Sequence, residues 1–354
     1  MTLPTTQRAA QIHTFGDPVT LLTAHPIPQP DTLRPNECLV KIEYAGVCQS
    51  DLHARNGDWL QKPTLPRIGG HEGVGTVVAI GAGTVDSIVS VGDRVGLKWL
   101  ARTCLKCEYC RKGDESSCPA RIVHGYTVDG TFTEYAIAWT DYVTPVPESL
   151  DGAAATSILC AGLTVYRGLK YINARAGDWV AIPGAGGGLG HMAVQYAANM
   201  GLRVLAIDSG DEKRKLCLSL GAEKWIDFKE SGENLVKDVI AATDGLGPHA
   251  ALIAAGSPTP YQQALWYIRP TGTLVAVGLP AAAQFQVPFE FLVGKELKLI
   301  GSAIGSRQDA IEALDHAARG KVKCHYSLRN IEDLETIFGE MKRGEITGRV
   351  VLKV

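Results

Sequence analysis

The sequence predicts an α/β protein of two domains, a β-rich domain followed by a doubly wound parallel sheet. Three observations support this prediction. The chain has 354 residues, a length that favours two domains with sizeable cores. Up to about residue 155, short apolar or alternating runs are separated by Gly, Pro and Asp, as in β-structure. From about residue 177, apolar strand-like runs alternate with helical segments, which is the rhythm of a parallel sheet covered by helices.

Composition restricts the classes of partner. The formal net charge of −2 gives no reason to expect nucleic acid or an anionic membrane surface as a partner. No apolar run approaches the ~20 residues that span a bilayer. The N-terminal stretch MTLPTTQRAAQIHTFGDP lacks the apolar centre of a secretory signal. We therefore expect a soluble, cytoplasmic protein.

Strand candidates in the first domain are the runs Cys38–Tyr44, Gly75–Ile80 and Arg94–Leu97. Between and after them lie three segments that offer metal ligands: Cys48-Gln-Ser-Asp-Leu-His53, Gly70-His71-Glu72-Gly73, and Cys160 within Ser157–Gly162.

Each of these segments alone is weak evidence for a metal site, because a cysteine among Ile, Leu and Ala is usually a buried, small apolar residue. Together they supply two thiolates and one imidazole. Zinc uses this set where a fourth position stays open to water or substrate. A metal site of the catalytic type is therefore one interpretation of these three segments, and ordinary packing of their side chains is the other.

Four of the nine cysteines fall within fifteen residues. Cys104, Cys107, Cys110 and Cys118 read C-x2-C-x2-C-x7-C, and a tight turn aims thiolates at this spacing at one zinc ion. Disulfides are disfavoured because cysteines three residues apart make strained pairs and the cytosol is reducing. An iron–sulfur cluster is the other alternative. A closed shell of four thiolates leaves no open position, so we expect a structural zinc.

A glycine-dense turn, Gly184–Gly190, opens the second domain. It follows the apolar run Trp179–Pro183 and precedes apolar residues at helical spacing up to Met200. Such a strand–turn–helix seats a dinucleotide pyrophosphate, because small residues let the backbone approach phosphate and the helix N-terminus presents unpaired N–H groups. Glycine content alone would also fit a flexible connector, which is the alternative interpretation of this turn.

The strand after this turn, Arg203–Asp208, ends in an acid about twenty residues past the turn. A carboxylate there accepts hydrogen bonds from the ribose hydroxyls and repels a 2′-phosphate, which favours NAD over NADP. A helix N-cap is the alternative role for Asp208. A strict G-x-G-x-x-G does not fit the turn, and the strand end at Pro183 favours the relaxed frame Ala185/Gly187/Gly190 over Gly188/Gly190/Ala193.

The remaining elements are read from apolar runs. Expected strands are Val180–Pro183, Arg203–Asp208, Lys224–Phe228, Ala250–Ala254, Thr273–Gly278 and Leu297–Ser302, and expected helices are 187–200, 211–220, 233–243 and 260–268. After about residue 304 come helical segments 307–319 and 331–343 and a last strand, Arg349–Val354. These ~50 residues are too many for trailing structure, so we expect them to return to the first domain.

In their order along the chain, these motifs resemble the zinc-containing medium-chain alcohol dehydrogenases. The resemblance rests on GVCQSDLHARNGDW, GGHEGVGTVV, the CxxCxxC loop, ILCAGLTVY and the Gly-rich turn, and it runs essentially end to end. The tetrameric yeast and fungal ethanol-oxidising branch is the most similar. The resemblance implies a GroES-like catalytic domain of residues 1–157 and 304–354, a Rossmann NAD-binding domain of residues 158–303, and a homotetramer.

The resemblance also assigns two zinc ions per chain. It implies that Cys48, His71 and Cys160 bind a catalytic zinc and that the four clustered cysteines bind a structural one. Glu72 would lie behind the catalytic zinc and exchange transiently as a ligand. Asp51 would orient the zinc-bound His71.

The implied reaction is the reversible oxidation of small primary alcohols to aldehydes. Zinc lowers the pKa of a bound hydroxyl from about 16 towards neutrality, so an alcohol is held as alkoxide while hydride passes to NAD. By resemblance, Ser50 takes the hydroxyl proton and passes it through a cofactor ribose hydroxyl to His53. Histidine suits this role because its side chain ordinarily titrates near neutral pH. Without the family, Ser50 would be a turn residue and His53 a surface histidine.

The resemblance extends to contacts with NAD. The pyrophosphate would be lined by the turn residues Gly184, Ala185, Gly186, Gly187, Gly188, Leu189 and Gly190, and also by Arg349. Lys213 would contact the adenosine ribose. The nicotinamide would be contacted by Val277, Gly278 and Leu279. One residue departs from the family. Gln49 stands where Arg or His is common, and without their charge we expect weaker cofactor binding and faster release of NADH.

Two tryptophans bear on substrate size. Trp59 and Trp99 match positions of bulky walls beside the zinc, which leave room for ethanol and short n-alkanols; either could instead belong to the core. Alternatives on the same scaffold are a zinc-free quinone or enoyl reductase, a polyol dehydrogenase, and a non-catalytic zinc- and nucleotide-binding protein. The complete Cys48/His71/Cys160 set, with Ser50 and His53, favours the alcohol dehydrogenase.

Overall fold

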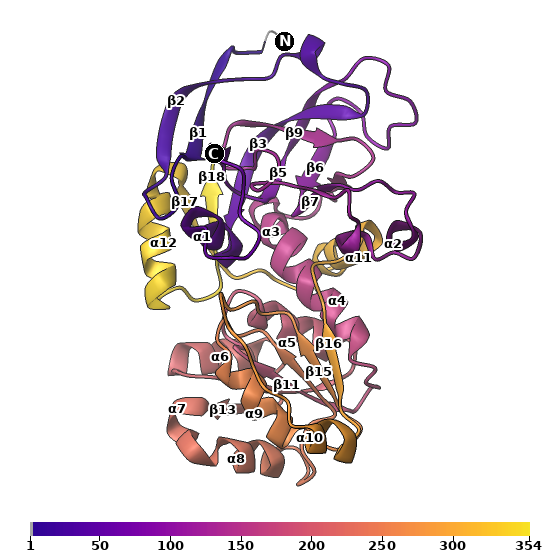
Figure 1. Ribbon diagram of the computed structural model, residues 1–354, viewed down its shortest axis with the longest axis vertical. Coiled ribbons are helices and arrows are strands. Elements are labelled where there is room, and N and C mark those ends of the chain that lie inside the picture. Colours follow the sequence, from indigo (N-terminus) through magenta and orange to yellow (C-terminus); the bar gives the residue numbers. More distant parts are fainter. Residues whose placement is uncertain (1–2) are drawn as a thin grey trace. The chain divides into compact units, whose positions relative to one another are not determined.

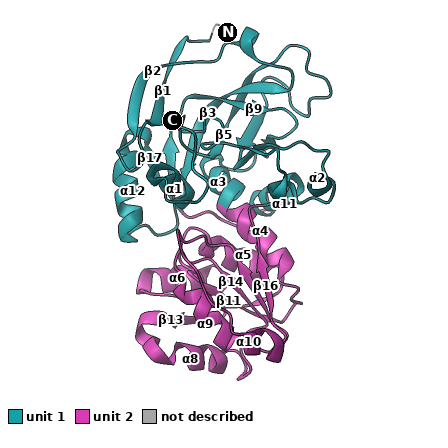
Figure 2. Ribbon diagram, viewed as in Figure 1, with its two compact units in different colours: residues 1–160, 305–318, 326–354 teal, residues 161–304, 319–325 magenta. Residues whose placement is uncertain are grey.

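The computed structural model describes residues 3–354, which form two compact units (Figure 2). Unit 1 contains the chain up to Cys160, Gly305–Ala318 and Tyr326–Val354. Unit 2 contains Ala161–Ile304 and the short segment Arg319–His325. Among the described residues, no helix combines the length and apolar character that a bilayer crossing requires.

Unit 1 is built on a mixed sheet whose described strands run in the order β10-β6-β5-β3-β18-β17, with β9 also paired to β3 (Figure 1). These strands are β3 (Glu37–Val47), β5 (Glu72–Ile80), β6 (Arg94–Leu97), β9 (Tyr135–Trp139), β10 (Thr144–Pro145), β17 (Tyr326–Asn330) and β18 (Arg349–Lys353). The three strands expected in this region are thus present, and β3 and β5 are longer than expected.

Smaller elements complete unit 1. They include the strands β1 (Thr6–Ile12), β2 (Thr20–Pro26), β4 (Arg67–Ile68), β7 (Leu100–Arg102) and β8 (Ile122–Val123). The helices are α1 (Gln49–Asn56), α2 (Glu108–Arg111), α3 (Gly152–Ser157), α11 (Arg307–Ala318) and α12 (Leu334–Arg343), with short 3-10 turns at Pro30–Thr32, Glu115–Ser117 and Ile331–Asp333.

The last strand, β18, lies inside the sheet of unit 1. It pairs antiparallel with β3, in the register Val350↔Val47 to Lys353↔Tyr44, and parallel with β17. Val350 and Leu352 belong to the same buried apolar cluster as Val40 and Ile42 of β3. Because each buried aliphatic side chain contributes about 1.5–3 kcal/mol, β18 is an integral part of this core.

Unit 2 is a six-stranded, all-parallel sheet among the described residues, in the order β13-β12-β11-β14-β15-β16. Its strands are β11 (Trp179–Pro183), β12 (Arg203–Asp208), β13 (Lys224–Asp227), β14 (Ala250–Ile253), β15 (Thr273–Ala276) and β16 (Lys298–Gly301). The order reverses between β11 and β14, as in a doubly wound dinucleotide-binding fold. β11 and β14 are buried at every position, which explains their continuous apolar sequences. The predicted fold class is therefore confirmed.

The helices of unit 2 alternate with these strands. They are α4 (Leu163–Tyr171), α5 (Gly190–Asn199), α6 (Asp211–Ser219), α7 (Phe228–Ser231), α8 (Leu235–Ala242), α9 (Thr259–Tyr267) and α10 (Phe289–Gly294), with a 3-10 turn at Gly232–Asn234. A π-helical turn, Ile158–Gly162, precedes α4; its residues up to Cys160 belong to unit 1. Helix α5 starts three residues later than expected, at Gly190, because Gly187–Leu189 still belong to the turn.

The segment Arg319–His325 groups with unit 2 because α5 holds its backbone. Gln195 donates to the carbonyl of Lys323 (2.9 Å) and accepts from its N–H (2.8 Å). Asn199 donates to the carbonyl of Lys321 (2.6 Å). Helix α5 begins at the glycine turn, so this segment is tied to the same helix that the turn introduces.

Candidate active site and cofactor pocket

Three separate segments of unit 1 converge on one group of metal-ligating atoms. One such atom from each of Cys48, His71, Glu72 and Cys160 lies within 4.8 Å of the others. Cys48 is the N-cap of α1, Glu72 begins β5, and Cys160 lies in the π-helical turn, a helix form that is frequent at functional sites. The structure therefore brings together the residues that the sequence offered as a second metal site.

Asp51 fixes the orientation of His71. The Nδ1 of His71 lies 2.8 Å from Asp51 Oδ1, and its Nε2 faces Cys160 Sγ at 3.2 Å. The other oxygen of Asp51 accepts a hydrogen bond from the N–H of Cys48 (2.8 Å). A carboxylate behind an imidazole is the usual support of a metal-binding histidine. Two thiols and an imidazole arranged in this way fit a zinc ion with one open position.

The protonation of this cluster is shared between its members. The pKa of Cys48 lies well below its usual range, chiefly because Cys160 donates a hydrogen bond to it, and the same bond together with burial raises the pKa of Cys160. Burial lowers the pKa of His71, but the Asp51 charge and hydrogen bonds outweigh it, so that this pKa is raised well above its usual value. Metal binding at such a site releases protons.

Glu72 and Arg349 form a buried ion pair beside these ligands. Arg349 Nη2 bonds Glu72 Oε1, and Arg349 Nε lies 3.3 Å from Ser157 Oγ. Among the described residues, Glu72 Oε2 has no hydrogen-bond partner, and its Oε1 is 3.8 Å from His71 Nε2. Burial raises the pKa of Glu72, although Arg349 opposes this. An unpaired carboxylate oxygen at this place fits an occasional ligand to the metal.

Aromatic side chains surround the same ligands. The rings of Trp99 and His71 meet edge-on with their centroids 5.0 Å apart, and the ring centroids of Trp59 and Trp99 are 6.2 Å apart. Tyr126, which sequence reasoning missed, packs against both tryptophans at 4.8 and 6.1 Å, and its hydroxyl reaches the carbonyl of Ser50 at 3.5 Å. No spacing rule singles out Tyr126, because only the fold brings it to α1.

Helix α1 carries three further predicted residues. Ser50 Oγ lies 3.7 Å from Cys48 Sγ, and His53 Nδ1 is 2.7 Å from Asp58 Oδ1. The His53 ring stacks on Trp59 at 4.8 Å. Asp58 was also missed, although its position five residues after His53 was visible in the sequence. Gln49 is the first residue of α1 and is exposed.

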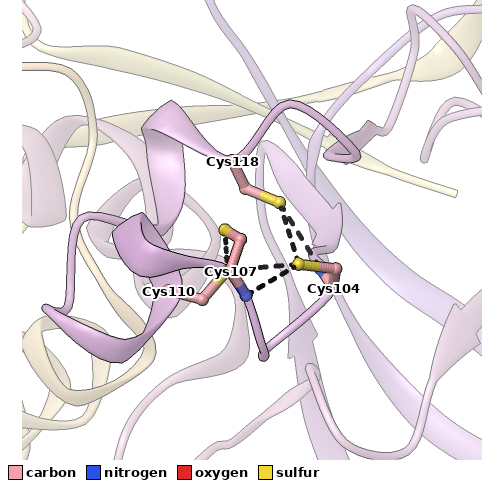
Figure 3. A group of neighbouring side chains, drawn as sticks. All are labelled: Cys104, Cys107, Cys110 and Cys118. Atoms are coloured by element: carbon pink, nitrogen blue, oxygen red, sulfur yellow. Dashed lines mark hydrogen bonds between the residues drawn. The ribbon is translucent and has the colours of Figure 1, made fainter.

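The four clustered cysteines point towards one another (Figure 3). The Sγ separations are 3.5 Å for Cys107–Cys110, 3.6 Å for Cys104–Cys118 and 4.0 Å for Cys104–Cys110. A tetrahedral zinc with Zn–S bonds of about 2.3 Å requires sulfur pairs about 3.8 Å apart, so the cluster fits this ion. All nine cysteines are free of disulfides. Hydrogen bonds from the N–H groups of Lys106 and Cys107 lower the pKa of Cys104 to about 6, which favours the thiolate.

The glycine turn of unit 2 shows which residues must be small. Gly184 has φ +83°, and a Cβ there would lie 2.9 Å from the N of Ala255. A Cβ on Gly190 would lie 2.0 Å from the carbonyl oxygen of Gly184. At Gly187 an added Cβ would meet only that same oxygen, at 3.4 Å, so this position is open to a ligand. A Cβ would therefore clash at Gly184 and at Gly190 but not at Gly187, so the backbone of the turn requires glycine at its first and last positions.

Asp208 ends β12 beside this turn. Its Oδ2 accepts from the N–H of Gly186 (2.9 Å), and its Oδ1 accepts from the N–H of Ser209 (2.9 Å) and from Lys213 Nζ (3.1 Å). Asp208 does not cap α6, because the N-cap of that helix is Gly210. The helix-cap alternative is therefore excluded, and the carboxylate is held against the glycine turn instead.

A cavity of about 430 Å³ lies next to Asp208 within unit 2. Gly184, Gly187, Asp208 and Lys213 line it, together with apolar residues that include Ile207 and Leu235. This size and lining are typical of a small-molecule site. Val277–Leu279 follow β15 directly and do not line the cavity; a Cβ on Gly278 would lie 2.2 Å from the carbonyl oxygen of Ala255.

Comparisons with known proteins agree with this geometry. Residues 34–148 match the family model "Alcohol dehydrogenase GroES-like domain", and residues 188–319 match "Zinc-binding dehydrogenase". The chain is 46% identical to an alcohol dehydrogenase of Schizosaccharomyces pombe over 99% of each chain. It is also 46% identical to alcohol dehydrogenase 1 of Emericella nidulans, over 100% of this chain and 99% of that one.

Two solved structures show the same fold. The alcohol dehydrogenase from the hyperthermophilic archaeon Aeropyrum pernix superposes with a TM-score of 0.88 at 29% identity, covering 98% of this chain and 100% of that one. Acetophenone reductase from Geotrichum candidum, solved in complex with NAD, superposes with a TM-score of 0.87 at 26% identity, covering 100% and 99%. The chain therefore belongs to the zinc-containing medium-chain alcohol dehydrogenases, on the branch of the fungal enzymes.

Proposed function

We propose that this protein is a zinc-dependent alcohol dehydrogenase that oxidises small primary alcohols such as ethanol with NAD and reduces the aldehydes in reverse. The observation that carries the proposal is the convergence of Cys48, His71 and Cys160 on one point, with Asp51 fixing the imidazole. The 46% sequence identity to fungal alcohol dehydrogenases, which extends over nearly the whole of each chain, supports the same proposal.

The proposal gives the metal-binding residues distinct tasks. Cys48, His71 and Cys160 hold the catalytic zinc, Glu72 is its occasional ligand, and Cys104, Cys107, Cys110 and Cys118 hold the structural zinc. When bound, the catalytic zinc acts as a Lewis acid on the substrate oxygen and NAD accepts the hydride. Asp51 keeps the Nε2 of His71 turned towards the cluster, and the charge of Arg349 balances that of Glu72.

Ser50 and His53 are proposed to move the hydroxyl proton. They are three residues apart on α1 and therefore share a face of that helix. Ser50 Oγ is close enough to the cluster to accept a hydrogen bond from a substrate hydroxyl. Asp58 and the stacked Trp59 fix the His53 ring, so its second nitrogen keeps one orientation for proton exchange.

The remaining assignments rest on the same proposal. Gly184–Gly190 and Arg349 bind the pyrophosphate, Asp208 and Lys213 the adenosine ribose, and Val277–Leu279 the nicotinamide. The catalytic domain comprises residues 1–157 and 304–354, and the NAD-binding domain residues 158–303. Similarity to the fungal branch further supports a cytoplasmic homotetramer, which light scattering on the purified protein would test.

One combined experiment tests the central proposal. Metal analysis is expected to find two zinc ions per chain, and absorbance is expected to show NADH formed from ethanol and NAD. A zinc-free reductase would contain no catalytic zinc, and a non-catalytic binding protein would contain zinc but form no NADH. Sorbitol oxidised faster than ethanol would identify a polyol dehydrogenase instead.

Removing one ligand of the structural zinc should reduce stability more than chemistry. Cys107→Ala is expected to lower the zinc content from two ions to one and the melting temperature by roughly 5–10 °C, at about 2–4 °C per kcal/mol. The kcat of the protein that remains folded should stay close to the wild-type value, since this cluster has no open position. Calorimetry, metal analysis and initial rates check this; a loss of kcat at full stability would contradict it.

Shortening Trp99 should change the size of the accepted alcohol. Trp99 lies against His71, so Trp99→Ala is expected to raise kcat/KM for 1-hexanol relative to ethanol by about tenfold. The matched variant Trp139→Phe, at the last residue of β9, should leave the chain-length profile unchanged. An unchanged profile in Trp99→Ala would show that this ring is not a pocket wall.

Adding charge at position 49 should tighten NADH binding. Gln49 is exposed and uncharged, and a protonated imidazole makes a stronger hydrogen bond to phosphate than a carboxamide. Gln49→His is expected to lower the NADH dissociation constant about three- to tenfold at pH 6 and less at pH 8, where the imidazole is neutral. Fluorescence titration measures the constant; equal or weaker binding at pH 6 would disprove a role in cofactor binding.

A further inference from the structure

His191 connects the glycine turn of unit 2 to the segment Arg319–His325. It is the second residue of α5 and is fully buried. Its Nδ1 lies 2.9 Å from the carbonyl oxygen of Gly187, and its Nε2 accepts a hydrogen bond from the N–H of His325 at 3.2 Å. The metal clusters and the proposed contacts with NAD give this imidazole no task.

The two contacts determine which ring nitrogen of His191 carries the hydrogen. A neutral imidazole has one N–H group and one acceptor nitrogen. Because the backbone N–H of His325 donates to Nε2, the hydrogen is on Nδ1, where it donates to the carbonyl of Gly187. The same carbonyl also accepts from the backbone N–H of His191 (3.1 Å). Two donors therefore hold the oxygen of Gly187 towards the start of α5.

Holding this oxygen also fixes the direction of the next N–H group. A trans peptide unit is planar, with its C=O and N–H on opposite sides, so the N–H of Gly188 points away from the oxygen of Gly187. Within residues 3–354, the N–H groups of Gly188, Leu189 and Gly190 bond no backbone carbonyl. Unpaired N–H groups at the start of a helix bind phosphate, whereas a carbonyl oxygen turned towards phosphate would repel it.

The bond to His325 is the last of a row of contacts along α5. Every fourth residue of the helix bonds every second residue of the segment, in the pairs Asn199–Lys321, Gln195–Lys323 and His191–His325. Four helical residues advance about 6 Å, and two residues of an extended chain span at most about 7 Å. The two repeats therefore stay in step, and the segment holds the ring of His191 beside the turn.

We propose that His191 is a positioning residue for the cofactor pyrophosphate. Its Nδ1–H keeps the carbonyl of Gly187 turned towards α5, so that the turn presents N–H groups to phosphate, and the segment Arg319–His325 keeps the ring in place. Because the side chain is fully buried, it acts through the backbone of the turn and not by contact with the cofactor. This inference rests on the proposed use of NAD.

The test removes the Nδ1 donor and then restores it. NADH is titrated by fluorescence into the zinc-loaded full chain, and melting temperatures are measured on the same samples. His191→Leu, which keeps a similar volume, is expected to raise the NADH dissociation constant about three- to tenfold, the range that one hydrogen bond supplies. His191→Asn should restore the wild-type constant, since an asparagine amide can donate to a carbonyl four residues earlier. His191→Ala gives the same comparison should the leucine variant not fold.

Gln195→Leu is the matched control. It removes the neighbouring pair of hydrogen bonds to the backbone of Lys323 and leaves the bond from His191 to Gly187 in place. This variant is expected to have a lower melting temperature and an unchanged NADH dissociation constant. The same result in His191→Leu would show that His191 has only a structural role, and would overturn the proposal.

Two further outcomes contradict the inference in different ways. Weak NADH binding in His191→Asn as well as in His191→Leu would refute a role of the Nδ1 donor while leaving the dehydrogenase intact. A wild-type chain that binds no NADH would refute the proposed use of NAD, and the role of His191 with it.

Discussion

Cys48→Ala is expected to lower kcat/KM for ethanol by about a thousandfold and to remove one of two zinc ions per chain. Cys48 supplies one of two thiolates in the cluster with His71 and Cys160, and its low pKa makes it the more readily ionised of the two. Polarisation of a substrate oxygen by a metal contributes several kcal/mol, and each 1.36 kcal/mol is about tenfold in rate. Initial rates and metal analysis on the same preparation give both quantities.

The matched control is Cys38→Ala. Cys38 lies earlier on β3, is fully buried in the apolar core of unit 1, and has a pKa raised to about 12 by burial. Its replacement should cost some stability and leave both zinc ions and kcat in place. If Cys48→Ala kept two zinc ions and wild-type rates, the cluster would not be the catalytic metal site.

Asp208→Ser is expected to reduce the preference for NAD over NADP by about a hundredfold. The carboxylate at the end of β12 accepts hydrogen bonds and repels a 2′-phosphate, and a hydroxyl does neither as strongly. A hydrogen bond to a charged group contributes about 1.5–3 kcal/mol, so its loss can change the cofactor preference by about a hundredfold. The ratio of kcat/KM values with the two cofactors measures the change.

The matched control is Asp227→Ser, which removes a comparable carboxylate. Asp227 also ends a parallel strand, β13, but its carboxylate accepts from the N–H groups of Gly210 and Lys229 and does not line the cavity. Its loss should lower stability and leave the cofactor ratio unchanged. Since Asp208 also anchors Gly186 and Ser209, melting temperatures of both variants must be measured. An unchanged ratio in Asp208→Ser would remove this residue from cofactor selection.

The sequence predicts best where the physical cause is local. All six parallel strands of unit 2 were expected from apolar runs. The pattern is clearest in β11 and β14, which are buried at every position and have no polar residue to interrupt the run. The four-cysteine cluster was predictable for a similar reason, since its ligands span fifteen residues. Helix starts were less accurate: the turn residues before α5 are small and apolar and resemble the helix that follows.

Long-range relations were not predictable from spacing. His71 and Cys160 are 89 residues apart, and Glu72 and Arg349 are 277 apart. The residue types made the first pair only one of two interpretations, and nothing in the sequence pattern linked the second pair. The need for glycine at position 184 could not be predicted from spacing, because it comes from the backbone of Ala255, after β14. Tyr126 became visible only through the aromatic cluster that it joins.

The position of β18 has a consequence for truncated variants. β18 pairs with β3 inside the sheet of unit 1, and it carries Arg349, the partner of Glu72. Without β18, one edge of β3 would be unpaired and the carboxylate of Glu72 would be buried without a compensating charge. Deletion of residues 349–354 is therefore expected to destabilise unit 1 and to reduce its metal content.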